Sequence, residues 1–264
     1  MKKLHISFAG AGKVGGALAR KLYESGHSID IVFSRTEKTG NLIADAVKAS
    51  WSDKPVFPQS TDIIFICVSD NSLEDVLKRI RCNNKTIVAH TAGSYGLDIF
   101  PPEIRRRGVF YPLQTFSEGR NLNFTEIPFL IEADNTETSD ALSGLASSLS
   151  RNVIYADAPK RRLIHLAAVF AGNFTNHMLT AGYEIAESAG FSNDILEPLI
   201  KETISKALEL GPGSSQTGPA LRNDKNTIVK HYNLLQEFPE FPEFRYLYEA
   251  VTQSIINYYN KNKR

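Results

Sequence analysis

Three glycines near the start of the sequence have the spacing of a turn that binds a dinucleotide. Gly10, Gly12 and Gly15 form the pattern GxGxxG, after a short apolar run and before a segment with helical spacing. In such a turn the first glycine permits a sharp bend, the second lets the backbone approach a pyrophosphate, and the third allows close helix–strand packing. The phosphates then face free N–H groups at the positive end of the helix dipole. A glycine-rich turn that binds nothing is the alternative. The expected pyrophosphate contacts are Gly10, Ala11, Gly12, Lys13, Val14 and Gly15.

The residues after the second expected strand indicate which cofactor is bound. An NAD enzyme usually places Asp or Glu about 20 residues beyond the glycines, where the carboxylate binds the ribose 2′-hydroxyl. This sequence has Ser34, Arg35 and Thr36 there, and Asp30 belongs to the start of the strand. A guanidinium and two hydroxyl groups suit a 2′-phosphate. The sequence therefore favours NADP over NAD; in the alternative interpretation Arg35 is only a solvated loop residue.

Two further strand ends are expected to contact the cofactor, because ligands of parallel sheets bind at the carboxyl ends of the strands. Small residues there would let a ribose and a nicotinamide lie against the backbone. His90 also has an alternative interpretation, as a strand-end histidine satisfied by hydrogen bonds. The residues concerned are Val68, Ser69 and Asp70 after one strand, and His90, Thr91, Ala92 and then Ser94 after the next.

Segments with strand and helix patterns alternate along the first part of the chain. Residues 62–68 form a nearly continuous apolar run, as expected of a strand covered on both faces. Asp70, Asn71 and Ser72 are candidate caps for the helix that follows. The alternation predicts an α/β fold with a parallel, doubly wound Rossmann sheet. Strands are expected at residues 4–9, 29–33, 62–68, 86–90, 109–113, 127–132 and 153–155, and helices at 14–25, 39–49, 72–80 and 137–149.

The pattern changes near residue 156 and is helical beyond it. Helices are expected at residues 160–190, 194–210, 226–236 and 244–259. The sequence thus predicts two domains. The first, residues 1–156, is an NADP-binding Rossmann domain, and the second, residues 157–264, is an all-helical domain for substrate binding and dimerisation.

Composition excludes several classes of partner. The net charge of +1 argues against binding to nucleic acid or to an anionic membrane, and no apolar stretch approaches the length of a membrane span. Two basic triplets, 105–107 and 160–162, are interpreted as solvated surface.

The only cysteines are Cys67 and Cys82, and Cys67 lies in an apolar run typical of a buried side chain. We expect a cytoplasmic protein, because few cysteines suit a reducing compartment and no signal peptide precedes the first strand.

One expected helix carries polar residues on an otherwise apolar surface. His165, Asn173 and Asn176 are eight and three residues apart, so that at about 100° per residue they share a face. Buried polar groups need partners. This face therefore either lines a cleft or forms a hydrogen-bond network between helices in the core.

The segment at residues 217–224 joins a loop to the next helix. Arg222 could bind a substrate carboxylate through two parallel hydrogen bonds, or it could pair with Asp224. Asp224 is better explained as the N-terminal cap of a helix that begins near Asn226.

Several segments together resemble a known superfamily. They are GAGKVGGALA, HTAGSYGLDIF, YPLQTFS, HLAAVFAGNFTNHML and TGPALRNDKNTIVKH. The sequence is similar to 6-phosphogluconate dehydrogenase-like proteins, and more closely to bacterial NADP oxidoreductases that join an F420-dependent NADP reductase-like domain to a domain of unknown function. The resemblance implies a Rossmann domain, a helical 6-phosphogluconate dehydrogenase-like C-terminal domain that dimerises, and an active site between them.

The sequence departs from the superfamily at one catalytic position. The β-hydroxyacid dehydrogenases carry a KxxN motif on the first long helix of the second domain, and this chain has Asn173 in place of the lysine and Asn176 at the asparagine. A neutral amide cannot act as a general acid or base. We therefore expect His165 to be the proton donor, since imidazole titrates near neutral pH, with Ser94, Gln114 and Asn176 orienting the substrate.

Two functions remain open at this point. The first is an NADP-dependent oxidoreductase that transfers hydride between NADP(H) and a small carbonyl, imine or hydroxy acid. The second is a non-catalytic NADP(H)-binding sensor or scaffold. In either case we expect a homodimer, because the helical half is rich in apolar side chains such as Phe238, Phe241, Phe244, Tyr246 and Tyr248.

Overall fold

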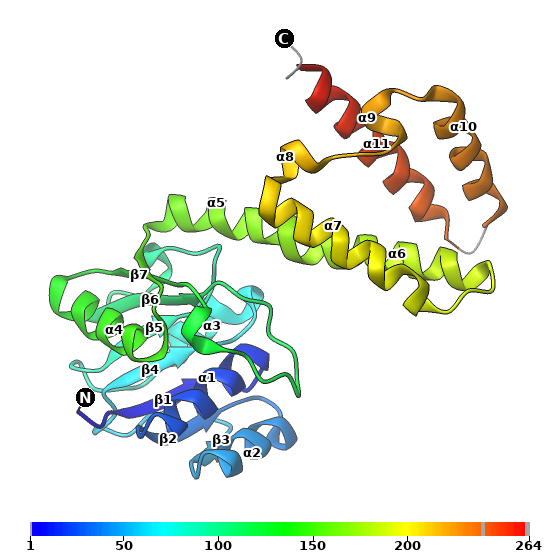
Figure 1. Cartoon of the computed structure of the whole chain (residues 1–264). Coiled ribbons are helices and arrows are strands. Elements are labelled where there is room, and N and C mark those ends of the chain that lie inside the picture. The colour runs from blue at the N-terminus through cyan, green and yellow to red at the C-terminus, as the bar shows by residue number, and fades with distance from the viewer. Residues whose placement is uncertain (1, 239–240, 262–264) are drawn as a thin grey trace. The chain divides into compact units, whose positions relative to one another are not determined.

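The computed structural model describes residues 2–238 and 241–261, and the chain folds into two compact units (Figure 1). The first unit is Met1–Asn173 and the second is Phe174–Arg264. The division falls within a helical run, later in the chain than the composition change at residue 156 on which the expected boundary was based.

The first unit is built on a sheet of eight strands in the order β3-β2-β1-β4-β5-β6-β7-β8. Neighbouring strands are parallel, except that β7 runs antiparallel to β6. The order reverses between β1 and β4, which is where doubly wound sheets bind their ligands. The strands are β1 His5–Ala9, β2 Ser28–Phe33, β3 Ser50–Ser52, β4 Ile63–Ile66, β5 Ile87–His90, β6 Arg106–Pro112, β7 Phe129–Ala133 and β8 Val153–Tyr155.

Helices cover both faces of this sheet and enclose two apolar cores. One core contains side chains of α1, α2 and α4, and the other contains side chains of α3 and of residues 100–104. All four residues of β4 are buried, which confirms the strand covered on both faces that the apolar run predicts. The helices are α1 Lys13–Glu24, α2 Glu37–Ala46, α3 Asp70–Arg79, α4 Thr136–Leu149 and α5 Ala158–Ala168, with short turns η1 Leu97–Ile99 and η2 Phe124–Glu126.

Two local features of this unit differ from the sequence expectation. The edge strand β3 was not expected, because three residues are too few to show an alternating pattern. The cap prediction for α3 was wrong: the helix begins at Asp70, and Ser69 is the residue before it. The Ser69 hydroxyl donates to the hydroxyl of Ser72. The side chain of Ser69 therefore makes no hydrogen bond to a backbone N–H of the helix.

The long helix expected at residues 160–190 is interrupted. After α5 the chain forms a π-helical segment, η3 Val169–Phe174, and then α6 Thr175–Ser188. A π turn closes hydrogen bonds to the fifth residue along and rotates less per residue than an α turn. The spacing that was expected to place His165, Asn173 and Asn176 on one α-helical face therefore does not apply.

The second unit is helical throughout its described part, as expected. Asp224 caps α10 as predicted, because its carboxylate accepts the N–H of Thr227 at 3.1 Å. The elements after α6 are η4 Asn193–Leu196, α7 Glu197–Leu210, α8 Pro212–Ser215, α9 Pro219–Arg222, α10 Lys225–Leu234, η5 Leu235–Glu237 and α11 Pro242–Lys261.

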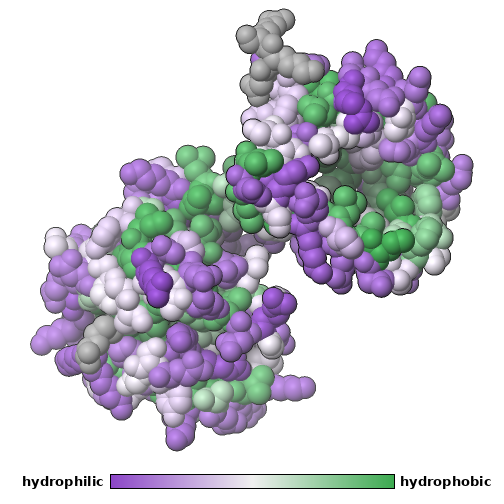
Figure 2. Space-filling model, viewed as in Figure 1, coloured by the Kyte–Doolittle hydropathy of each residue, from purple (hydrophilic) through white to green (hydrophobic). Residues whose placement is uncertain are grey.

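This second unit buries few of its apolar side chains. Phe244 is buried, whereas Leu208 is 84% exposed and Tyr246 is 73% exposed. Figure 2 shows hydrophobic residues around a hollow in this unit, and a cavity of about 380 Å³ lies among residues of α6, α10 and α11. Among the described residues, no helix is long and apolar enough to span a bilayer.

Candidate cofactor cleft and active site

The glycine turn has the backbone that its sequence predicts. Gly10 has a φ of +114°, and a Cβ there would overlap the carbonyl of Cys67. A Cβ at Gly15 would overlap the carbonyl of Gly10, so the fold itself requires both glycines. A Cβ at Gly12 would meet nothing within 4 Å. The second glycine thus leaves open space in front of α1, as a bound pyrophosphate requires.

The start of α1 is suited to an anion. Gly12 is the residue before the helix and has no side chain to satisfy the free N–H groups, and the first turn contains no acidic residue. Lys13 is exposed in that turn. Free N–H groups and the helix dipole together favour a phosphate at this position.

A cavity of about 420 Å³ extends from this turn along the carboxyl ends of β1, β2 and β4. Arg35 and Thr36 line it from the β2–α2 connection, and Val68 and Ser69 line it from the end of β4. Arg79 was not predicted, yet it lines the same cavity. It lies seven residues from Ser72, with Asp75 and Val76 between them, and this spacing places all four residues on one face of α3.

The Ser34 hydroxyl is occupied within the protein. It donates to the carbonyl of Thr36 at 2.8 Å and accepts the indole N–H of Trp51 at 3.1 Å. Ser34 is buried and lines the cavity. Its side chain therefore shapes the turn that presents Arg35 and Thr36.

The turn after β5 is held by the His90 ring. His90 is fully buried and stacks on Phe100. Its Nδ1 accepts the N–H of Ala92 at 3.2 Å, and its Nε2 lies 3.4 Å from the carbonyl of Gly96. Burial lowers the pKa of His90 to about 4. The ring is therefore neutral with its proton on Nε2, in line with the hydrogen-bonded alternative, and Thr91 and Ala92 are the more exposed residues of this strand end.

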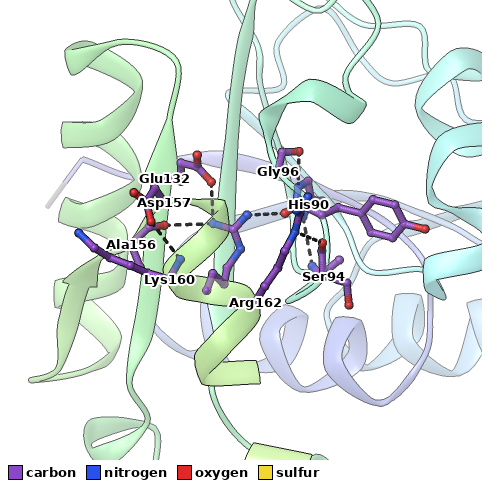
Figure 3. A network of polar contacts seen from close by, with 11 residues as sticks. His90, Ser94, Gly96, Glu132, Ala156, Asp157, Lys160 and Arg162 are labelled. Atoms are coloured by element: carbon purple, nitrogen blue, oxygen red, sulfur yellow. Dashed lines mark hydrogen bonds and ion pairs between the residues drawn. The ribbon is translucent and has the colours of Figure 1, made fainter. Parts of the chain in front are cut away.

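The basic triplet at residues 160–162 is solvated surface only in part: Lys160 and Arg162 are exposed, as expected, but Arg161 is not. Arg161 is fully buried and pairs with Glu132 at 2.6 Å, and it also donates to the carbonyls of Ala156 and Tyr95. In Figure 3 Arg162 lies beside Ser94, whose carbonyl accepts its Nε–H at 2.8 Å. These bonds tie α5 to β7 and to the turn after β5.

A phenol–imidazole pair lies beyond the carboxyl end of β5. The Tyr111 hydroxyl is 2.9 Å from Nδ1 of His165, and the two rings meet edge to face. Tyr111 can reach this position because β6 runs on past β5, whose last residue His90 pairs with Val109. A Cβ at Gly93 would lie 2.7 Å from the His165 ring, so a side chain there would displace the imidazole.

The environment of this pair favours a protonated phenol. Partial burial raises the pKa of Tyr111, with the charge of Arg161 acting against this shift and that of Asp70 adding to it. The sequence analysis selected His165 but missed Tyr111. The sequence does contain a clue to Tyr111, because it places a hydroxyl-bearing side chain directly after the apolar residues Val109 and Phe110, in the strand expected at residues 109–113.

The remaining predicted catalytic residues are spread over both units. Ser94 and His165 lie in the first unit, as does Asn173, which is exposed in η3. Asn176 and Arg222 lie in the second unit, where both are exposed. The first unit thus brings together the turn that carries Ser94 and the Tyr111–His165 pair. In the part of the chain that the structure describes, no group of His, Cys, Asp and Glu residues could hold a metal ion.

Comparison with protein families matches both halves of the chain. Residues 5–93 match the family described as NADP oxidoreductase coenzyme F420-dependent, and residues 127–255 match a domain of unknown function, DUF2520. No curated protein matches the sequence.

Solved structures match nearly the whole chain. A Bacteroides fragilis protein described as a "putative NADP oxidoreductase" is 36% identical, with a TM-score of 0.87, over 97% of this chain and 98% of that one. A reductive aminase from Aspergillus terreus in complex with NADPH and ethyl-5-oxohexanoate is 16% identical, with a TM-score of 0.65, over 98% of this chain and 100% of that one. A 1-pyrroline-5-carboxylate reductase from Streptococcus pyogenes is 12% identical, with a TM-score of 0.60, over 97% and 99%. At such low identity the last two show a shared fold.

Proposed function

The chain belongs to the NADP oxidoreductases that carry an F420-dependent reductase-like domain followed by DUF2520, and from this we propose that it reduces a small carbonyl or imine with NADPH. The reverse reaction, oxidation of a hydroxy acid or amine, uses the same groups. The observation that carries the proposal is the Tyr111–His165 pair, which lies at the strand end where a Rossmann fold presents its nicotinamide.

The cofactor site fits NADP on three counts. Gly12 leaves space at the start of α1 for the pyrophosphate. Arg35 and Thr36 line the cavity beyond β2, where they could bind a ribose 2′-phosphate, and Arg79 adds a second guanidinium. When bound, NADPH supplies a hydride to the substrate.

The protein contributes position and a proton. His165 lies over Gly93 at the end of β5, and its imidazole can give a proton to a developing oxyanion or amine. Ser94 lies in the same turn, with its backbone fixed by Arg162. We propose that Ser94 and Asn173, both in the first unit, orient the substrate. The roles expected of Asn176 and of Arg222, which would bind a substrate carboxylate, stay predictions.

Two of the similar structures belong to proteins whose names state an enzymatic reaction, and these reactions suggest where a substrate search should begin. The Aspergillus terreus protein is a reductive aminase and the Streptococcus pyogenes protein reduces a pyrroline carboxylate. Both reactions involve a C=N bond, so cyclic imines and mixtures of small ketones with amines belong in the panel beside keto acids.

The test is a screen for NADPH oxidation by the full-length protein over that panel. We expect at least one compound to be turned over, and His165→Ala to lower its turnover roughly a hundredfold, with NADPH affinity little changed. His5→Ala is the matched control, because His5 lies at the opposite end of β1. Tight NADPH binding with no turnover of any compound would favour the sensor or scaffold instead.

A further inference from the structure

We propose that Tyr111 is a positioning residue that holds Nδ1 of His165, so that Nε2 is the nitrogen that gives its proton to the substrate. This role rests on the proposed reductase function, and it adds a residue that the sequence patterns did not select.

Two neighbours hold the imidazole ring, and the helix that carries it is anchored to the sheet. The Tyr111 hydroxyl lies 2.9 Å from Nδ1, and the backbone of Gly93 lies under the ring, where a Cβ would come within 2.7 Å. The helix that carries His165 is anchored one turn earlier, because Arg162 is bonded to the carbonyl of Ser94 and Arg161 is paired with Glu132. The ring therefore cannot turn without breaking a contact to β6 or to the turn after β5.

A phenol is a suitable partner for Nδ1 in both protonation states of the ring. A hydroxyl group can donate one hydrogen bond and also accept. Because burial raises the pKa of Tyr111, the phenol keeps its proton near neutral pH and donates to Nδ1 of the neutral imidazole. When the imidazole is protonated, Nδ1–H donates to the phenol oxygen instead. In both states Nε2 carries a proton and stays available to another group.

The proton transfer balances with Tyr111 as a spectator. The substrate carbon takes the hydride with its electron pair, and the π pair of the C=O or C=N bond moves to the oxygen or nitrogen. That atom takes the proton from Nε2 of the imidazolium, and the N–H bonding pair stays on Nε2. The transfer leaves the ring as the other neutral tautomer, whose Nδ1–H donates a hydrogen bond to the phenol oxygen, and a proton taken up from water at Nε2 restores the imidazolium.

His90, the last residue of β5, does not offer the same chemistry. His90 is fully buried, its Nδ1 accepts a backbone N–H, and its Nε2 faces the carbonyl of Gly96. His165 is only partly buried and has one ring nitrogen bonded by Tyr111.

The test follows the ring protons of His165 by NMR in the full-length protein with 15N-labelled histidine, and it needs no substrate. Signals that disappear in His165→Gln identify the ring. At a pH where the ring is protonated, we expect Nδ1–H to exchange with water about two- to tenfold more slowly than in Tyr111→Phe, as loss of one hydrogen bond implies. Gly93→Ala should speed the exchange similarly, because its Cβ displaces the ring. Tyr155→Phe is the control, since that phenol is 60% exposed in β8.

The outcomes separate this inference from the proposed function. Equal Nδ1–H exchange in the wild type and Tyr111→Phe would overturn the role of Tyr111. If Tyr111→Phe does not fold, the wild-type protein is compared with a blocked histidine peptide. Equal Nδ1–H exchange rates in the two would also overturn the role of Tyr111. Once a substrate is found, Tyr111→Phe should lower kcat several-fold and leave NADPH affinity unchanged. Failure to bind NADPH would instead contradict the proposed function and leave the NMR result standing.

Discussion

Arg35 and Arg79 bring two positive charges to the cofactor cavity from different elements, the β2–α2 connection and α3. If Arg35 binds the 2′-phosphate as proposed, Arg35→Ala should lose a charge-assisted hydrogen bond of about 1.5–3 kcal/mol, which lowers NADP affinity roughly 10- to 150-fold. NAD lacks this phosphate, so its affinity should change little. Arg79→Ala should also weaken NADP more than NAD. Calorimetric titration of both cofactors checks this.

Arg105→Ala is the control for that titration, because Arg105 is exposed and lines no part of the cavity. A wild-type protein that binds NAD and NADP equally would contradict the predicted preference. An Arg35→Ala variant that keeps a full preference would contradict the role of Arg35.

His90 should make the folded protein sensitive to acid. The pKa of His90 is about 4 in the folded protein, whereas the ordinary value is 6.5. Between pH 4 and pH 6.5 the unfolded chain therefore binds a proton that the folded chain does not. Stability therefore falls as the pH is lowered from 6.5 towards 4, by up to about 3 kcal/mol from this group. Denaturant unfolding across this range should show a shallower fall for His90→Asn than for the wild type. Parallel pH curves for the two proteins would refute the assignment.

At the scale of elements, α5 is joined to the sheet through one buried ion pair. Arg161→Met leaves the Glu132 carboxylate, whose side chain is 19% exposed, without its partner. Removing one member of a buried pair costs about 3 kcal/mol or more, because the other charge stays desolvated. Urea unfolding of the full chain should show this loss, whereas Lys160→Met, an exposed neighbour in the same helix, should change stability little. Similar midpoints for the two variants would show that the pair contributes nothing.

The same elements show what the sequence could predict. Strands such as β4 and helices such as α1 follow from local apolar patterns and from glycines that the turn itself requires. Arg161 could not be assigned in this way, because its burial depends on partners at Glu132 and Tyr95, far away in the sequence. Tyr111 was missed for the same reason, and the π segment was missed because its residues fit an α-helical pattern equally well.

At the scale of the whole molecule, the second unit exposes many large apolar side chains. Leu199, Leu208 and Tyr246 are among them. A two-fold dimer would bury such a surface. Light scattering at micromolar concentration should give the mass of a dimer, and Leu199→Glu combined with Leu208→Glu should shift it towards a monomer. A monomeric wild-type protein would contradict this prediction.

The antiparallel pairing of β6 with β7 has a consequence for redesign. Tyr111 pairs with Leu130 and Pro112 with Phe129, so both ends of the connection between the strands are fixed at the ladder. That connection, residues 113–128, carries Glu118 into the wall of the cofactor cavity. Its exposed middle, residues 117–121, can therefore be exchanged without moving the phenol, whereas Phe124 and Ile127 belong to the buried core and have to stay. Grafting this exposed segment between relatives offers a way to alter cofactor and substrate selectivity while the Tyr111–His165 pair keeps its place.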